Sequence, residues 1–169
     1  LSVLADSNAI DCLRARSLQN PTVILEPGTA NREWSQVGGS AARAPINYAL
    51  ADKPRRIWSL RFGDGNRRRR KLTSGPIVIN KTLFAIDSAG TVSARRLIDG
   101  QTYWQRSIMP QGESSGFGGA VAYADGRIHA VAGLDYIVTL EARTGKALWY
   151  QRLKAPVRSA PAVVDGLVY

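Results

Sequence analysis

The chain has 169 residues, of which 44% are hydrophobic and 21% are charged, values typical of a folded globular protein rather than a disordered one. A formal net charge of +10 is compatible with an acidic partner such as nucleic acid, anionic lipid or an acidic protein face. The single cysteine, Cys12, excludes an internal disulfide framework and a cysteine-based zinc site, and no stretch approaches the roughly 18 apolar residues of a membrane helix.

Residues 1–33 are predicted to form an N-terminal extension. This stretch has no leading Met and no basic-then-apolar signal peptide, because its first ten residues are interrupted by Asp6 and Asn8. We therefore expect a chain that is trimmed or processed at its front. The Asn, Pro and Ser content of the extension favours a tether rather than a packed element.

Residues 34–74 are predicted to be blade material of a repeated β-structure, and they contain the basic run Arg67–Lys71. A glycine-rich stretch, 63–66, precedes this run directly, which favours a solvated loop tip. A surface for nucleic acid, acidic lipid or an acidic protein is the alternative interpretation. No aromatic side chains are interleaved to stack on bases, and we therefore expect no nucleic-acid partner.

From residue 75 onward, short apolar segments alternate with turn residues, and no segment has a helical period. We expect full four-stranded blades at about 75–112 and 117–157, and the start of a further blade at 158–169. The predicted strands of the two full blades are 77–80, 83–86, 92–95 and 102–106, then 120–123, 128–132, 137–141 and 148–152.

A period of about 45 residues unites these segments. Trp58, Trp104 and Trp149 are 46 and 45 residues apart, and glycine turns at Gly100 and Gly145 precede the last two. Repeats of 40–50 residues with four strands each are typical of β-propellers. The sequence therefore predicts an all-β, incomplete propeller of roughly the first two to three blades.

Six residues are predicted to be structural blade markers. A tryptophan on each outermost strand would cover the seam to the next blade, and glycines would supply turns. They are Trp58, Trp104, Trp149, Gly100, Gly145 and Gly126. The single histidine, His129, takes the position of Phe84 in the repeat, and we interpret it as a packed side chain. We predict no catalytic, cofactor-binding or metal-binding residue, and the sequence identifies no partner-binding residue.

Several segments carry a resemblance to a known family. Residues 138–149 (VTLEARTGKALW) resemble the repeat of the pyrroloquinoline-quinone-like propeller superfamily, whose pattern is an apolar strand, a Gly turn and a Leu-Trp pair. Within it, the chain resembles the BamB family of outer-membrane assembly lipoproteins from about Trp34 to its end. The segments concerned are WSQVGG at 34–39, RIW at 56–58, GDG at 63–65, FGGAVAY at 117–123 and APVRSAP at 155–161.

The resemblance implies a function without chemistry. BamB-family members are eight-bladed propellers, lipid-anchored on the periplasmic face of the outer membrane in Gram-negative bacteria, that bind no quinone. They bind the periplasmic domains of BamA and assist insertion of nascent outer-membrane proteins. For this chain, the resemblance implies a non-enzymatic scaffold with no cofactor, and a lipid-bearing cysteine upstream of Leu1.

Two alternatives share the same repeat. A quinone-dependent dehydrogenase would need acidic and amide ligands for calcium, a catalytic Asp and, in many members, a vicinal disulfide. Cys12 alone cannot make that disulfide, but further blades could hold the other groups. The second alternative is a propeller that binds an anionic surface through Arg67–Lys71.

Overall fold

The computed structural model describes residues 27–43, 47–65, 68, 71–111, 113, 119–132, 135–157 and 159–169. Within these ranges all regular secondary structure is β, with ten strands in three antiparallel sheets. Most of the predicted 1–33 extension, Cys12 and most of the Arg67–Lys71 run lie outside the described residues. The described part of the chain contains no helix that is long and apolar enough to cross a membrane.

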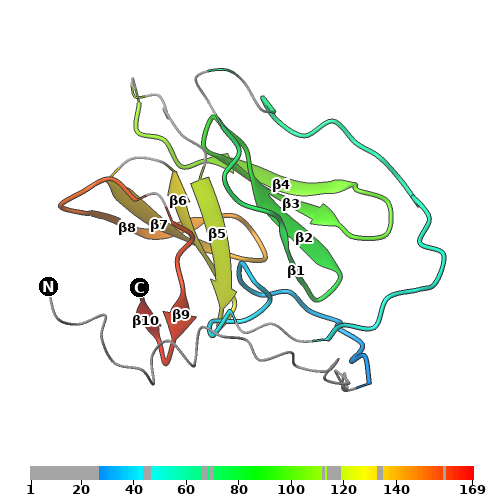
Figure 1. Ribbon diagram of the computed structural model, residues 1–169. Coiled ribbons are helices and arrows are strands. Elements are labelled where there is room, and N and C mark those ends of the chain that lie inside the picture. The colour runs from blue at the N-terminus through cyan, green and yellow to red at the C-terminus, as the bar shows by residue number, and fades with distance from the viewer. Residues whose placement is uncertain are drawn as a thin grey trace, which may run out of the picture.

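Two of the sheets are four-stranded meanders, in which each strand pairs with the next one in sequence (Figure 1). The first consists of β1 (Ile77–Ile79), β2 (Thr82–Ile86), β3 (Thr91–Arg96) and β4 (Thr102–Ser107). The second consists of β5 (Gly119–Ala124), β6 (Arg127–Ala132), β7 (Tyr136–Glu141) and β8 (Ala147–Arg152). A hairpin of β9 (Val163–Val164) and β10 (Leu167–Val168) follows. The all-β prediction is confirmed, and each strand predicted in the two sheets lies within one residue of its observed bounds.

The same two-residue turn opens each unit. In the first sheet Ile79 pairs with Thr82, so residues 80–81 form the turn, and both have positive φ (47° and 59°). Residues 125–126 (48° and 74°) and 165–166 (49° and 76°) repeat this geometry. Two central residues with positive φ define the type I′ turn, whose twist matches that of paired strands. Asn, Asp and Gly accept this conformation most readily, and this explains why the turn residues were recognisable in the sequence.

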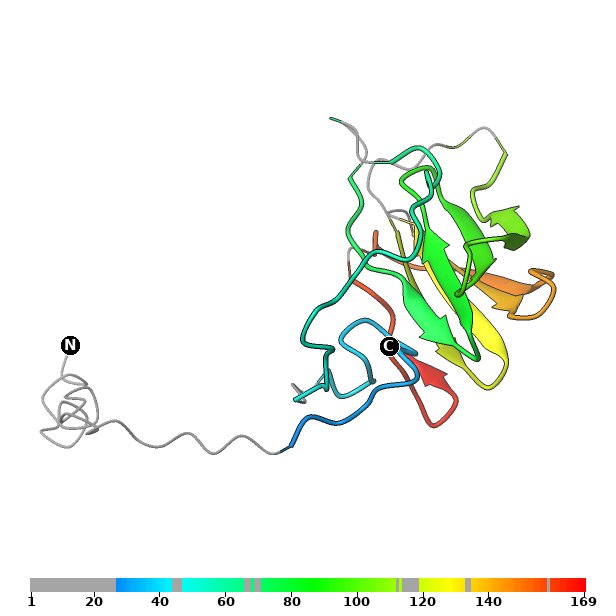
Figure 2. The ribbon, with the colours of Figure 1, turned by 90° about the vertical axis from the view of Figure 1, so that its right-hand side faces the viewer.

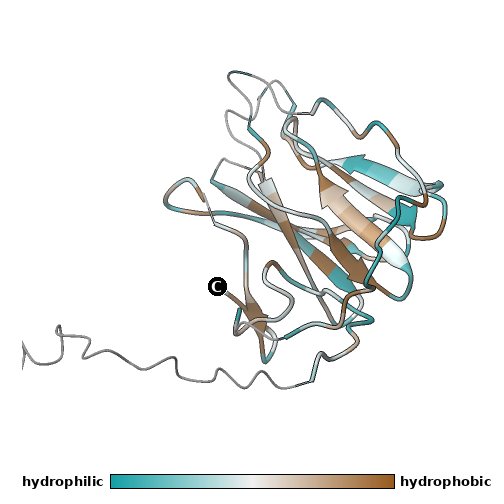
Figure 3. Ribbon diagram, turned by 45° about the vertical axis from the view of Figure 1, so that its right-hand side comes forward, coloured by the Kyte–Doolittle hydropathy of each residue, from teal (hydrophilic) through white to brown (hydrophobic). Residues whose placement is uncertain are grey.

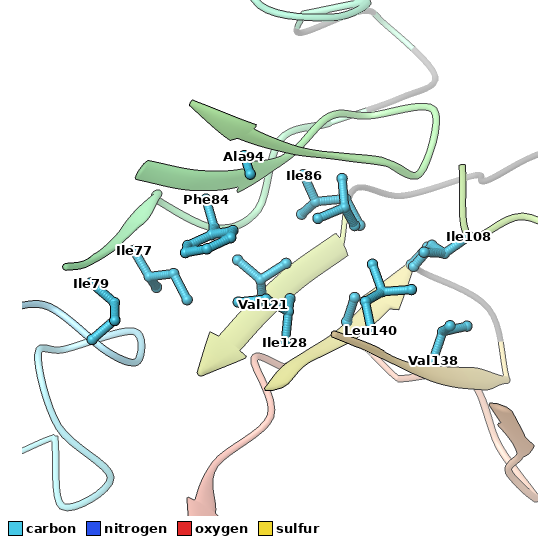
Figure 4. Packing of buried hydrophobic residues seen from close by; sticks show 13 residues of the cluster. Ile77, Ile79, Phe84, Ile86, Ala94, Ile108, Val121, Ile128, Val138 and Leu140 are labelled. Atoms are coloured by element: carbon cyan, nitrogen blue, oxygen red, sulfur yellow. The ribbon is translucent and has the colours of Figure 1, made fainter. Parts of the chain in front are cut away.

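The main core lies between the two four-stranded sheets, which stack face to face (Figure 4). Because strand side chains alternate between faces, one face of each sheet enters this core. The first sheet contributes Ile77, Ile79, Phe84, Ile86, Val92 and Ala94, and the second contributes Val121, Ile128, Ala130, Val138 and Leu140. Figure 3 shows hydrophobic residues concentrated in the inner strands, whereas β4 is largely hydrophilic. This is the packing of adjacent propeller blades.

The first strands of the three units lie next to one another, β1 beside β5 and β5 beside β9. They are the innermost strands of the arrangement, and β4 and β8 are the outermost. Residues 27–76, which include all of the predicted blade material of 34–74, form no strand in their described part. They make two isolated bridges, between Thr29 and Tyr48 and between Trp34 and Val78. Figure 2 shows the blue and cyan chain of residues 27–50 passing beside the red hairpin.

Candidate interaction surface

The seam between the two sheets is closed by Trp104. Its indole Nε1–H donates to the carbonyl oxygen of Ala142 at 3.0 Å, in the turn between β7 and β8. Its ring lies on Gly145, where an added Cβ would come within 2.6 Å of ring carbons. Gly145 therefore serves this seam in two ways, through its positive φ of 71° and through the absence of a side chain under the indole.

Trp58 makes the same contact with the first sheet. Its Nε1–H donates to the carbonyl oxygen of Leu97 at 2.8 Å, and its ring lies 3.3 Å from the position of a Cβ on Gly100. The donor-to-acceptor pattern is thus repeated from one sheet to the next. Segment 57–62 consequently takes the place, relative to the first sheet, that β4 takes relative to the second.

Trp149 is the third marker and is 42% exposed on β8. Its ring lies 6.2 Å from the ring of His129, centroid to centroid, just as the Trp104 ring lies 6.0 Å from that of Phe84. Within the described residues, no carbonyl receives its indole N–H. The exposed indole and the adjoining wall of the second sheet form a groove of about 480 Å³, toward the β9–β10 hairpin.

His129 takes the place in the repeat that Phe84 has in the first sheet, and the residue that pairs with it on the next strand also differs between the two sheets. Its Nδ1 lies 2.9 Å from the Oγ1 of Thr139, which stands where the first sheet has Ala94. Burial lowers the pKa of His129 below its ordinary value, and the charge of Arg127 lowers it further. The Phe-to-His change thus comes with a hydroxyl that gives the imidazole a hydrogen-bond partner. This environment is consistent with a packed, neutral histidine.

Gly126, the remaining predicted marker, has a φ of 74° in the turn between β5 and β6. An added Cβ there would meet nothing within 4 Å. Glycine is therefore favoured there by backbone conformation alone, unlike at Gly145, and the equivalent turn of the first sheet has Lys81 with a φ of 59°.

Residues 34–36, which we call the inner strap, connect three units. Trp34 and Val78 of β1 exchange two backbone hydrogen bonds, at 2.7 and 2.9 Å. The carbonyl of Ser35 accepts the N–H of Tyr123 of β5 at 2.8 Å. The buried Gln36 side chain donates to the carbonyl of Val163 in β9 and accepts its N–H, at 2.9 and 3.0 Å. Three successive residues thus bond to three successive innermost strands. The sequence interpretation missed this role.

A second groove, of about 430 Å³, opens at the outer rim where the first sheet meets the second. We call it the rim groove. It is lined by Ser107, Ile108, Met109, Pro110, Tyr136, Val138, Ala147 and Tyr150. Tyr150 is 75% exposed. At one end Arg152 lies over the Tyr136 ring at 5.4 Å and binds Asp135 at 2.7 Å, a contact that lowers the pKa of this carboxyl group.

Only part of the predicted basic run lies within the described residues. Of the basic run, Arg68 and Lys71 are described, and both are exposed. Among the described residues there is no group of three or more His, Cys, Asp or Glu side chains that could hold a metal ion.

The repeated sheets, the seam tryptophans and the adjacent innermost strands define the class of protein, a β-propeller. A family model described as outer membrane protein assembly factor BamB matches residues 109–169. The curated outer membrane protein assembly factor BamB of Salmonella typhimurium strain LT2 is 25% identical over 123 residues, which is 67% of this chain. The repeats are thus BamB-like, as the sequence predicted. The chain spans 30% of the length of that relative.

Two solved structures share the fold. One is a europium-containing methanol dehydrogenase, with a TM-score of 0.62 and 23% identity, covering 85% of this chain and 27% of that one. The other is BamB from Moraxella catarrhalis, with a TM-score of 0.52 and 20% identity, covering 67% of this chain and 32% of that one. Both comparisons identify the β-propeller fold.

Proposed function

We propose that this protein is a non-enzymatic scaffold in the assembly of outer-membrane β-barrel proteins, and that it binds the periplasmic domains of BamA. The observation that carries the proposal is the similarity to a curated assembly factor over two thirds of the chain. On this proposal the protein is a periplasmic lipoprotein on the outer membrane, it assists nascent outer-membrane proteins, and it needs no cofactor. Residues 1–33 are the tether to the membrane anchor, and 34–169 are propeller.

The rim groove is the surface that best suits a protein partner. It combines two tyrosines with Met109 and Pro110 over an opening of about 430 Å³. Aromatic side chains and Met are enriched at protein interfaces, and tyrosine in addition buries a large, rigid area at a low entropic cost. The stacked sheets hold the groove in place, so that binding requires little ordering of the protein itself.

The excess of basic residues supports this function by raising the rate of association with a partner. A net charge of +10 accelerates encounter with an acidic partner, and the effect weakens as salt screens it. Association with BamA domains is therefore expected to be faster at low than at high ionic strength. Rates that stay flat across ionic strength would contradict electrostatic steering.

The test is a titration against purified BamA periplasmic domains at two salt concentrations. Saturable binding is expected, and Tyr150→Ala should weaken it about tenfold or more, the effect of an interface hot spot. Tyr103→Ala is the matched control, since Tyr103 is also exposed on an outermost strand but does not line the groove. Absence of binding at either salt would refute the scaffold proposal, and equal losses in the two variants would refute the role of the rim groove.

A quinone-dependent dehydrogenase is the second candidate, favoured by the structural likeness to a methanol dehydrogenase over 85% of the chain. Equilibrium dialysis with pyrroloquinoline quinone and calcium distinguishes the two candidates. Stoichiometric retention of quinone would favour the dehydrogenase, and retention at the level of an unrelated protein would favour the scaffold.

A further inference from the structure

Two hollows open between the two four-stranded sheets, at the end where the turns that join β1 to β2, β3 to β4, β5 to β6 and β7 to β8 lie together. The first hollow, of about 280 Å³, is lined by Ile79, Asn80, Thr82, Phe84, Tyr123, Gly126, Ala142 and Arg143. The second, of about 370 Å³, is lined by Thr82, Ala94, Tyr103, Trp104, Ala142 and Arg143. The two hollows thus have largely apolar and aromatic walls and share one cation, Arg143.

Arg143 is free to bind a ligand. Its side chain is exposed, and no hydrogen bond or ion pair engages the guanidinium within the described residues. Two acids of the neighbouring turns are already bonded. Asp99 accepts the Nε–H of Arg96 at 2.9 Å, and the carboxylate of Glu141 accepts the hydroxyl of Thr144.

The charge of the four turns favours an anionic ligand. The basic side chains that make no ion pair in the described structure are Lys81, Arg127, Arg143 and Lys146, and the corresponding acids are Asp125 and Glu141. Cations therefore exceed acids at this end of the sheets, and the whole chain adds a net charge of +10. An acidic partner would be attracted to this end before it makes contact.

The fold itself does not require an arginine at position 143. The turns from β3 to β4 and from β7 to β8 close with the same backbone hydrogen bond, in which the glycine N–H of residue 100 or 145 donates at 2.8 Å. In the first of these turns Ile98 takes the place that Arg143 has in the second. An isoleucine thus suits the same turn, and the charge of Arg143 is available for a role outside the fold.

We infer that the two hollows bind a short acidic segment of a partner protein, with an Asp or Glu carboxylate on Arg143 and the flanking apolar side chains in the hollows. A guanidinium takes a carboxylate through two parallel hydrogen bonds. The Phe84 and Trp104 rings, 6.0 Å apart between centroids, supply an aromatic floor. The amide of Asn80 and the hydroxyl of Tyr103 supply polar groups for the peptide main chain.

This arrangement suits a carboxylate better than a row of phosphates. A lipid surface or a nucleic-acid backbone is held by several cations at once, whereas one cation lines these hollows and most of their walls are apolar. The site is also separate from the rim groove, which lies at the other end of β4, where Ser107 lines it. The inference therefore goes beyond the proposed function and does not rest on it.

The test uses two synthetic peptides, acetyl-Ser-Leu-Glu-Phe-Ser-amide and the same peptide with Gln in place of Glu. Each is titrated into the full chain, and binding is followed by the indole N–H resonance of Trp104, which lines the second hollow. The Glu peptide should bind about fivefold tighter at low salt, the size expected for a partly exposed bidentate pair. High salt should narrow this difference.

Arg143→Ile is the decisive variant, since Ile98 suits the equivalent turn, and it should abolish the preference for Glu. Lys146→Gln is the matched control. It removes a cation from the same turn, its repeat partner is Gln101, and Lys146 lines neither hollow, so that the preference should remain.

Equal affinities for the two peptides would overturn the inference. So would a Glu preference that survives Arg143→Ile, or one that is lost equally in Lys146→Gln, because charge would then act without a defined site. Binding of anionic phospholipid vesicles or of a single-stranded oligonucleotide that depends on Arg143, with no binding of either peptide, would overturn it in favour of a phosphate surface.

Discussion

The contact of the Trp104 indole with Gly145 at the seam between the two sheets gives a prediction whose magnitude follows from the geometry. An alanine at Gly145 must adopt a φ near 71° and would place its Cβ 2.6 Å from the indole carbons of Trp104. The left-handed backbone costs about 1–2 kcal/mol in any non-glycine residue. Displacing the indole adds about 2–3 kcal/mol for overpacking and for weakening the bond to Ala142. We expect Gly145→Ala to lower the free energy of unfolding by about 3–5 kcal/mol.

Gly126→Ala is the matched control. Its φ of 74° imposes the same backbone cost, but nothing lies within 4 Å of the added Cβ. The expected loss is about 1–2 kcal/mol. Gly100→Ala should fall between the two, because its Cβ would lie 3.3 Å from the Trp58 ring, a distance that small shifts can relieve.

The assay is equilibrium urea unfolding followed by circular dichroism, with equal m-values as the check that the variants remain comparable. A Trp104→Leu background completes a double-mutant cycle. In that background Gly145→Ala should cost no more than Gly126→Ala. Equal losses of unfolding free energy for the two glycine variants in the wild-type background would refute the role of the Trp104–Gly145 contact. So would a difference between the two variants that persists in the Trp104→Leu background.

Three further predictions concern individual hydrogen bonds. Because burial depresses the pKa of His129, the unfolded state takes up its proton first, and stability should fall as the pH drops below about 6.5. Urea midpoints at pH 5 and 8 check this, and His129→Phe with Thr139→Ala should remove that part of the pH dependence. Gln36→Leu should cost about 1–3 kcal/mol and speed amide exchange in the β9–β10 hairpin, and unchanged exchange would contradict the strap. The bond from Arg96 holds the pKa of Asp99 at about 2, and Arg96→Gln should raise it toward 3.8 in an NMR titration.

The sequence by itself determined the repeat and the strands. The turn at 125–126 is specified by Asp-Gly, and the strands on either side follow from alternation over a few residues. Both signals are local, because they depend on backbone conformation and on which face of one sheet is buried. The 45-residue period then supplied the propeller, since each unit must bury its face against the next.

The tertiary structure alone decided how each repeat position is used. Trp104 is recognisable from the repeat, but only the packing of the second sheet on the first shows that its indole donates across the seam to Ala142, because the partner of a seam residue belongs to a neighbouring unit. The bonds of Gln36 to Val163 span 127 residues, a separation at which no local pattern reports proximity. The sequence carried one indication that Arg95 is buried, because Arg95 aligns with Leu140 in the 45-residue repeat. Only the packing of segment 57–62 shows that this buried arginine lies over the Phe62 ring and that its Nε lacks a hydrogen-bond partner in the described structure.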